Sequence, residues 1–303
     1  MWFKNLQIFQ LSKDIDFDLD GLESKLKAFQ FEPCKSIETY RIGWELPAAT
    51  AGQLHHVSAG AILLCLRRQE KVIPAAVVNE TLQERVEEIE LNQGRRVGRK
   101  EKLSIKEDII SELTPRAFVR SSFTWGYIAP KDNLVIVDAS SDKKADEFLD
   151  LLRQTLRSLP VVPFNTEQSP SSVMTDWLQD SSKRPQGLEL DRQCVLRSDI
   201  EEGSVIRAKQ GELDAEEIIN HIETGKQVSE LAINWQERVQ CIICDDLKIK
   251  RLRFGDDLLS EAQDNYSDED PMTRLDADFT LMTLELKRFI PALAGLMGGQ
   301  TGF

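Results

Sequence analysis

Between Pro74 and Pro115 the chain reads PAAVVNETLQERVEEIELNQGRRVGRKEKLSIKEDIISELTP. Apolar residues recur at helical spacing in the first half of this segment, and the pattern stops at Gly94. In the second half Ser104 and Glu107 have the spacing of a capping box, which predicts a helix start, and Pro115 ends the pattern. The segment therefore predicts two helices joined at a connecting tip.

The connecting tip is basic, although the protein as a whole is acidic. The chain has a net charge of -13, and nine acids with one base fall between Asp256 and Asp278. Between Arg95 and Lys106, by contrast, six bases accompany one acid. Such segregation can create a cationic surface on an acidic protein. The tip residues that we assign to phosphate contacts are Arg95, Arg96, Arg99 and Lys100. The alternative for this tip is a solvated helical hairpin.

A long strand is predicted after the second helix. Its alternation places Arg116, Phe118 and Arg120 on one otherwise polar face. An aromatic ring between two arginines suits an interface with nucleic acid or protein. The alternative is that a neighbouring helix covers this face and makes Phe118 an ordinary core residue.

Two further groups of cations lie in the second half of the chain. Arg207, Lys209 and Gln210 stand between a predicted strand and a helix that Asp214 is expected to cap, a position where donors commonly meet an anion. An ordinary surface loop is the alternative. Four cations occupy the six positions 248–253, where they either line a DNA-facing sheet or protect an edge strand from aggregation.

The remaining patterns predict an α+β fold in which helices cover antiparallel sheets. We expect three lobes, which are a central α+β lobe from 1–76 and 115–165, the helical hairpin from 77–114 and a C-terminal α+β lobe from 166–303. The acidic segment 256–278 is expected to be a loop, followed by a helix over Phe279–Met297.

Patterns for catalysis or metal binding are scarce. The chain has three histidines and lacks the phosphate-loop, nucleophile-elbow and zinc-helix motifs. Cys241 and Cys244 have metal-ligand spacing, but in a strand they point to opposite faces, so we interpret them as packed thiols. We therefore expect no enzyme, no cofactor and no metal. The alternative is a Mg²⁺-dependent nuclease that uses the D-x-K pattern of Asp246 and Lys248.

The apolar stretches are too short for a membrane span, and the five cysteines are odd in number and mostly lie in apolar runs. We therefore expect a cytoplasmic protein without disulfides or a membrane partner.

Several ordered segments resemble the RdgC family of bacterial recombination-associated proteins, nearly from end to end. The segments are WFKNLQIFQLS (Trp2–Ser12), LTPRAF (Leu113–Phe118), SLPVVP (Ser158–Pro163), VIRAK (Val205–Lys209), NHIETGK (Asn220–Lys226) and DADFTLMT (Asp276–Thr283). The resemblance implies a nucleoid-associated protein that binds double-stranded DNA, and also single-stranded DNA, with little sequence preference. It also implies a role in replication fork repair and restraint of strand exchange by the RecA recombinase.

The family further implies a ring-shaped homodimer built from two horseshoe-shaped protomers. Carried onto this chain, the helical hairpin is a projecting arm, and Phe118 is a contact between protomers. The expected lumen or closure residues are Arg116, Arg120, Arg207, Lys209 and Gln210. The family pattern often stays basic after Lys209, whereas this chain continues with Gln210 and Gly211, which implies a weaker contact there. A scaffold that meets RecA directly and touches DNA incidentally is a third interpretation.

Overall fold

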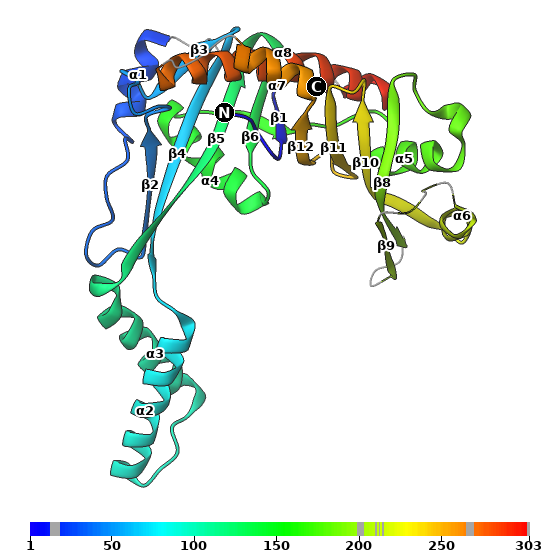
Figure 1. The fold of residues 1–303 in the computed structure, drawn as a ribbon. Helices are drawn as coiled ribbons and strands as arrows, with labels where there is room; N and C mark the ends of the chain where they lie inside the picture. Colours follow the sequence, from blue (N-terminus) through cyan, green and yellow to red (C-terminus); the bar gives the residue numbers. More distant parts are fainter. Residues whose placement is uncertain are drawn as a thin grey trace. The chain divides into compact units, whose positions relative to one another are not determined.

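Two antiparallel sheets and the helices beside them form the protein (Figure 1). The computed structural model describes residues 1–12, 19–198, 203–209, 211, 213, 215–264 and 270–301. The chain divides into two compact units, which are unit 1 (Met1–Leu26, Leu46–Cys65 and Thr124–Phe303) and unit 2 (Lys27–Glu45 and Leu66–Phe123). The predicted α+β class is confirmed. The predicted division into three lobes stays a prediction.

The first sheet has the strand order β2-β4-β5-β6-β1-β7, and β3 pairs with β4. Its strands are β1 (Gln7–Leu11), β2 (Tyr40–Glu45), β3 (His55–Ser58), β4 (Ala61–Val72), β5 (Phe118–Ala129), β6 (Leu134–Asp138) and β7 (Val161–Pro163). Strands β4 and β5 run from unit 1 into unit 2. The tight β5–β6 connection needs a left-handed residue, which Asn133 supplies at φ 53°, and it sets the register Ala129 opposite Leu134.

The second sheet has the order β12-β11-β10-β8-β9 and belongs to unit 1. Its strands are β8 (Leu188–Ser198), β9 (Val205–Lys209), β10 (Lys226–Trp235), β11 (Val239–Cys244) and β12 (Ile249–Phe254). The two sheets meet where Leu6, just before β1, exchanges backbone hydrogen bonds of 2.8 and 3.0 Å with Ile249 of β12. This bridge covers part of the β12 edge, which would otherwise expose unpaired backbone groups.

The helices beside the two sheets belong to unit 1. They are α1 (Leu19–Lys27, of which the last residue falls in unit 2), α4 (Asp142–Leu156), α5 (Pro170–Gln179), α6 (Glu216–Glu223), α7 (Asp256–Asp264) and α8 (Pro271–Leu296). Figure 1 shows α8 lying along both sheets. Phe279, Met282 and Phe289 of α8 are buried in one core with residues of both sheets, such as Ile136 and Ile243. This helix therefore joins the two sheets through a common apolar core.

Unit 2 contains the predicted pair of helices, α2 (Ala75–Gln93) and α3 (Arg99–Leu113), followed by a short 3-10 turn, Thr114–Arg116. Gly94 ends α2 in the left-handed conformation at φ 61°, as its position predicted. The predicted capping box is wrong, because α3 begins at Arg99 after Gly98 and Ser104 lies inside the helix. Backbone pairing with the preceding turn extends the helix past a local capping signal.

Two further predictions about the C-terminal part need correction. The acidic segment is not one loop, since its described residues form α7 and the first turns of α8, and the last helix begins at Pro271 rather than Phe279. Asp214, the expected helix cap, lies outside the described residues. In the part of the chain that the structure describes, no helix combines the length and apolarity that a membrane crossing needs.

Candidate nucleic-acid interface

The four predicted tip cations differ in whether they are already paired. Arg95 forms two hydrogen bonds of 2.7 Å to the carboxylate of Glu101 and one of 2.8 Å to Gln93. The hydrogen bonds with Glu101 raise the pKa of Arg95 and lower that of Glu101. Arg96, Arg99 and Lys100 are exposed and have no ion-pair partner among the described residues. Three of the four cations are therefore available to an external anion.

The first turn of α3 is an unusual place for two of these cations. Arg99 and Lys100 lie at the helix N-terminus, where the helix dipole is positive and cations are unfavourable. Backbone N–H groups at such an end also point towards bound anions. A phosphate group at this position would interact with the helix end and with both side chains, so the arrangement suits anion binding better than stability.

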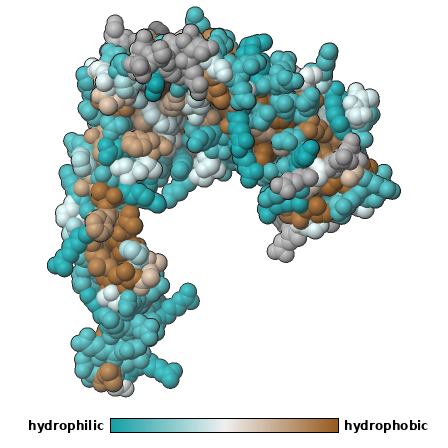
Figure 2. Space-filling model, in the orientation of Figure 1, coloured by the Kyte–Doolittle hydropathy of each residue, from teal (hydrophilic) through white to brown (hydrophobic). Residues whose placement is uncertain are grey.

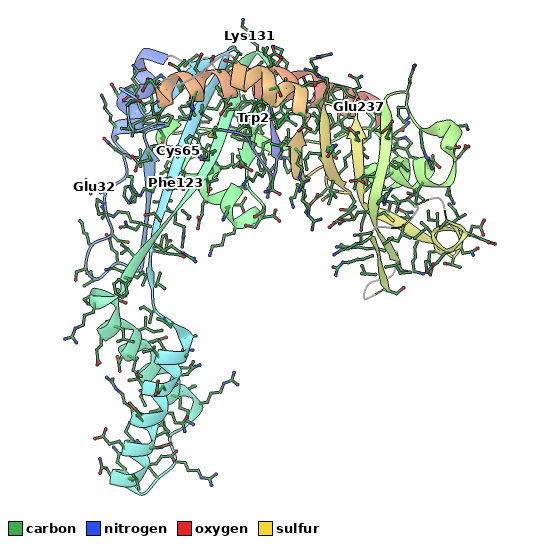
Figure 3. The ribbon with its side chains drawn as sticks, viewed as in Figure 1. Trp2, Glu32, Cys65, Phe123, Lys131 and Glu237 are labelled. Carbon is green, nitrogen blue, oxygen red and sulfur yellow. The ribbon has the colours of Figure 1, made fainter. Side chains whose placement is uncertain are left out.

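The start of β5 carries an exposed aromatic residue between cations. Phe118 is 88% exposed, and its neighbours Val119 and Phe123 are about half exposed, so the interpretation of Phe118 as a core residue is wrong. Arg116 lies in the 3-10 turn before the strand, so the predicted alternation holds only for Phe118 and Arg120. Figure 2 shows hydrophobic surface on this unit, and Figure 3 labels Phe123 among its side chains.

The two arginines beside Phe118 also differ. Arg120 donates a hydrogen bond to the carboxylate of Glu70, which lowers the pKa of Glu70. Arg116 is exposed and has no ion pair in the described residues. Nearby, Arg67 pairs with Glu45 at 2.9 Å and lies 4.3 Å from the ring centre of Phe31, so it helps to hold this part of the sheet together.

One face of the second sheet is cationic. Arg207 and Lys209 of β9 are exposed and pair in register with Val195 and Gln193 of β8, which places all four on the same face. Neither cation has an ion pair in the described part of the chain. Gln210, the third predicted residue of this group, lies outside the described residues.

The sheet brings to this face Arg197, which sequence reasoning missed, and two of the four cations in 248–253. Arg197 of β8 lies opposite Val205, and Lys250 and Arg253 of β12 lie opposite Ile242 and Gln240. Lys250 and Arg253 share a face although they are three residues apart, because Arg251 between them is in a left-handed bulge at φ 51°. Lys250 pairs with Glu230 at 2.9 Å, whereas Arg197 and Arg253 have no ion pair among the residues described. Simple alternation could not reveal this grouping.

The D-x-K pattern meets a further acid in the structure. The Lys248 ammonium lies 2.7 Å from the carboxylates of both Asp246 and Asp142, and Gln7 donates a hydrogen bond to Asp142. With Asp146 these residues line a cavity of 360 Å³. No group of three or more His, Cys, Asp or Glu side chains is placed to hold a metal in the described ranges. The arrangement is a salt bridge that joins α4 to the turn before β12.

Lys248→Met should therefore lower stability modestly. Burial alone would lower the pKa of Lys248, but its two ion pairs raise it, and hydrogen bonding to Lys248 lowers the pKa of Asp142. A carboxyl group whose pKa is lower in the folded than in the unfolded chain stabilises the fold at pH values above its unfolded pKa, near 4. This stabilisation is lost as the pH falls through the pKa of the folded state. We expect Lys248→Met to lower the free energy of unfolding by about 1 kcal/mol at pH 7, and by less below about pH 4.

Urea unfolding of Lys248→Met and the wild type at pH 7 and pH 3 measures this. A Lys131→Met variant at an exposed lysine is the control. If Lys248→Met lowers the free energy of unfolding by the same amount at pH 7 and at pH 3, the ion pairs do not have this role.

Cys241 and Cys244 are both buried and not bonded to each other. In register, Cys241 lies opposite Ile233 on the core face and Cys244 opposite Glu230 on the other face. Burial raises the pKa of both thiols, which keeps them protonated and unreactive. The prediction of packed thiols is confirmed.

The fold and its unpaired cations define an α+β protein in which positive charge is gathered on local surfaces of an acidic chain. A family model described as "Putative exonuclease, RdgC" matches residues 1–300. The recombination-associated protein RdgC of Aeromonas hydrophila is 46% identical over 301 residues, and that of Tolumonas auensis is 45% identical, each match covering 99% of both chains. This chain belongs to the RdgC family.

Proposed function

We propose that this protein binds double-stranded DNA through the phosphate backbone, without reading sequence. The observation that supports the proposal best is that eight cations on the helical tip, at the start of β5 and on one face of the second sheet are exposed and have no ion pair among the described residues. They are Arg96, Arg99, Lys100, Arg116, Arg197, Arg207, Lys209 and Arg253. Elsewhere on this acidic chain many cations, such as Arg41, Arg85 and Arg238, are paired with carboxylates. Long unpaired cations contact phosphates, which carry no sequence information.

The protein acts as a homodimer that closes around the duplex, with Phe118 at a contact between protomers. The exposed Phe118 supports this, because a large aromatic side chain left in water gains free energy when a second copy covers it. The names of the relatives associate those proteins with recombination. By occupying the duplex in the nucleoid, this protein restrains strand exchange by RecA during replication fork repair.

Paired and unpaired tip arginines offer a matched test of phosphate contact. Arg96→Ala should reduce the slope of log affinity against log salt by about 0.9, because one counterion fewer is released. Arg95→Ala removes the same formal charge from a residue that Glu101 already neutralises, so its slope should change less. Fluorescence anisotropy with two duplexes of unrelated sequence measures both slopes. Equal slopes for the two variants would contradict phosphate contact by Arg96.

A second candidate is a Mg²⁺-dependent nuclease, and the family description contains the words "putative exonuclease". The observation that favours it is the approach of Asp142 to the D-x-K pair, which the sequence alone did not reveal. In our proposal these groups form a structural salt bridge, so end-labelled duplex incubated with Mg²⁺ should stay intact. Cleavage that stops on chelation and in Asp246→Asn would establish the nuclease instead.

The third interpretation, a scaffold that meets RecA directly, makes a different prediction. Restraint of strand exchange would then survive the combined change of Arg96, Arg99 and Lys100 to alanine, although DNA affinity falls. Under our proposal both fall together, because occupation of the duplex causes the restraint. A strand-exchange assay run beside the anisotropy measurement distinguishes the two.

A further inference from the structure

A cavity of 190 Å³ lies in unit 1 between α8 and the first sheet. Its walls are mostly apolar and come from the β3–β4 turn, strands β4 to β6 and one face of α8, including Ala61, Ala129, Ile136 and Ile290. An apolar cavity of about 150 Å³ is large enough to hold benzene. The size and lining therefore suit a small aromatic molecule.

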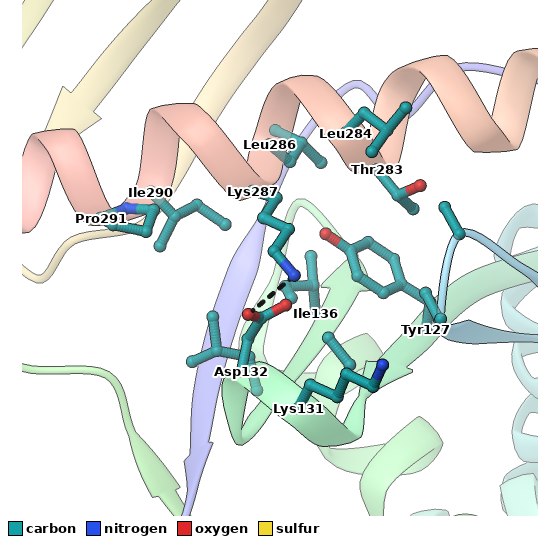
Figure 4. A pocket seen from close by; sticks show the side chains of 15 residues that line it. Tyr127, Lys131, Asp132, Ile136, Thr283, Leu284, Leu286, Lys287, Ile290 and Pro291 are labelled. Atoms are coloured by element: carbon teal, nitrogen blue, oxygen red, sulfur yellow. Dashed lines mark ion pairs between the residues drawn. The ribbon is translucent and has the colours of Figure 1, made fainter.

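One buried hydroxyl group faces this cavity. Tyr127 is only 3% exposed, and its hydroxyl has no hydrogen-bond partner among the described residues. Rings of Phe3 and Phe279, with centres at 5.8 and 5.7 Å, hold the tyrosine ring in place. Figure 4 shows the hydroxyl end of the tyrosine ring on the side that faces α8. Because this hydroxyl reaches the cavity without a partner in the described part of the chain, it is free to bond to a molecule that fills the cavity.

The helix also has a backbone carbonyl without its helical donor at the cavity wall. Pro291 lines the cavity and has no N–H group, so the carbonyl of Lys287, four residues earlier, lacks its helical donor. The Lys287 side chain reaches Asp132 at 3.2 Å, which balances both charges at the cavity wall. Burial raises the pKa of Tyr127, so its hydroxyl stays protonated and able to donate at neutral pH.

We propose that this cavity binds a small uncharged aromatic molecule that carries one hydroxyl group, a phenol being the simplest example. The ring fills the apolar space, and its hydroxyl accepts a hydrogen bond from Tyr127 and donates one to the Lys287 carbonyl. Phenol therefore binds more tightly than benzene, which cannot form these hydrogen bonds. The inference is independent of DNA binding.

Titrations of the full chain with phenol and benzene, followed by ligand-observed NMR, test the proposal. Tyr127→Phe keeps the ring and the cavity, and it should weaken phenol binding about tenfold while leaving benzene binding unchanged. Tyr40→Phe, which removes a hydroxyl from a half-exposed tyrosine in unit 2, should change neither. Ala129→Val should weaken both ligands by narrowing the cavity.

Absence of phenol binding to the wild type at millimolar concentration would overturn the proposal. Binding that Tyr127→Phe leaves unchanged would overturn it as well. If Ala129→Val fails to fold, the selective loss of phenol binding in Tyr127→Phe still decides the question.

Discussion

Changing Arg116, Arg207 and Lys209 together to alanine should weaken duplex binding about a hundredfold near 0.1 M salt and lower the salt slope by about 3. Each of these side chains is exposed and has no ion pair among the described residues. Each phosphate contact releases condensed counterions, so its loss appears both in affinity and in slope. Anisotropy titrations between 50 and 200 mM salt, about the range where the effect is steep, measure both quantities.

The matched control is a triple variant of cations that are already paired, namely Arg95, Arg120 and Lys250 changed to alanine. It removes the same formal charge from the chain. Exposed ion pairs contribute little to stability, so this variant should stay folded. If the two triple variants lose affinity equally, net charge alone controls binding and the unpaired cations have no special role. If the wild type does not bind duplex at low salt, the proposal of DNA binding fails.

Phe118→Glu should convert a homodimer into monomers at micromolar concentration. Truncation of an aromatic anchor at the centre of an interface costs about 2 kcal/mol or more, and a two-fold dimer contains the residue twice. A loss of about 4 kcal/mol raises the dimer dissociation constant roughly a thousandfold. Because Phe118 is 88% exposed within the chain, the thermal stability of the monomer should not fall. Sedimentation velocity with circular dichroism measures both effects.

Ile37→Glu provides the control for this change. Ile37 is 83% exposed in the same unit, so the substitution places an equal charge on an equally exposed apolar side chain. It should leave the dimer intact. A wild-type protein that sediments only as a monomer would contradict the proposed dimer, and a dimer unaffected by Phe118→Glu would place the contact elsewhere.

Local sequence predicted those elements whose boundaries depend on local chemistry. Gly94 ends α2 because glycine adopts the left-handed conformation easily. The capping box at Ser104 failed because a local signal inside a longer helix is overridden by backbone pairing with the preceding turn. Local patterns are therefore least reliable at element ends.

For the candidate site, too, the sequence predicted some features and the tertiary structure decided the others. The sequence by itself determined that positive charge gathers near the helical tip, around Phe118 and near Lys209, and its ordered motifs determined the family. Only the tertiary structure decided which cations are unpaired, because Glu101 and Glu70 reach Arg95 and Arg120 through folded geometry. It also decided the exposure of Phe118. Arg120 and Glu70 are 50 residues apart, and Arg95 reaches Glu101 across the turn between two helices, so no periodic pattern specifies either pair.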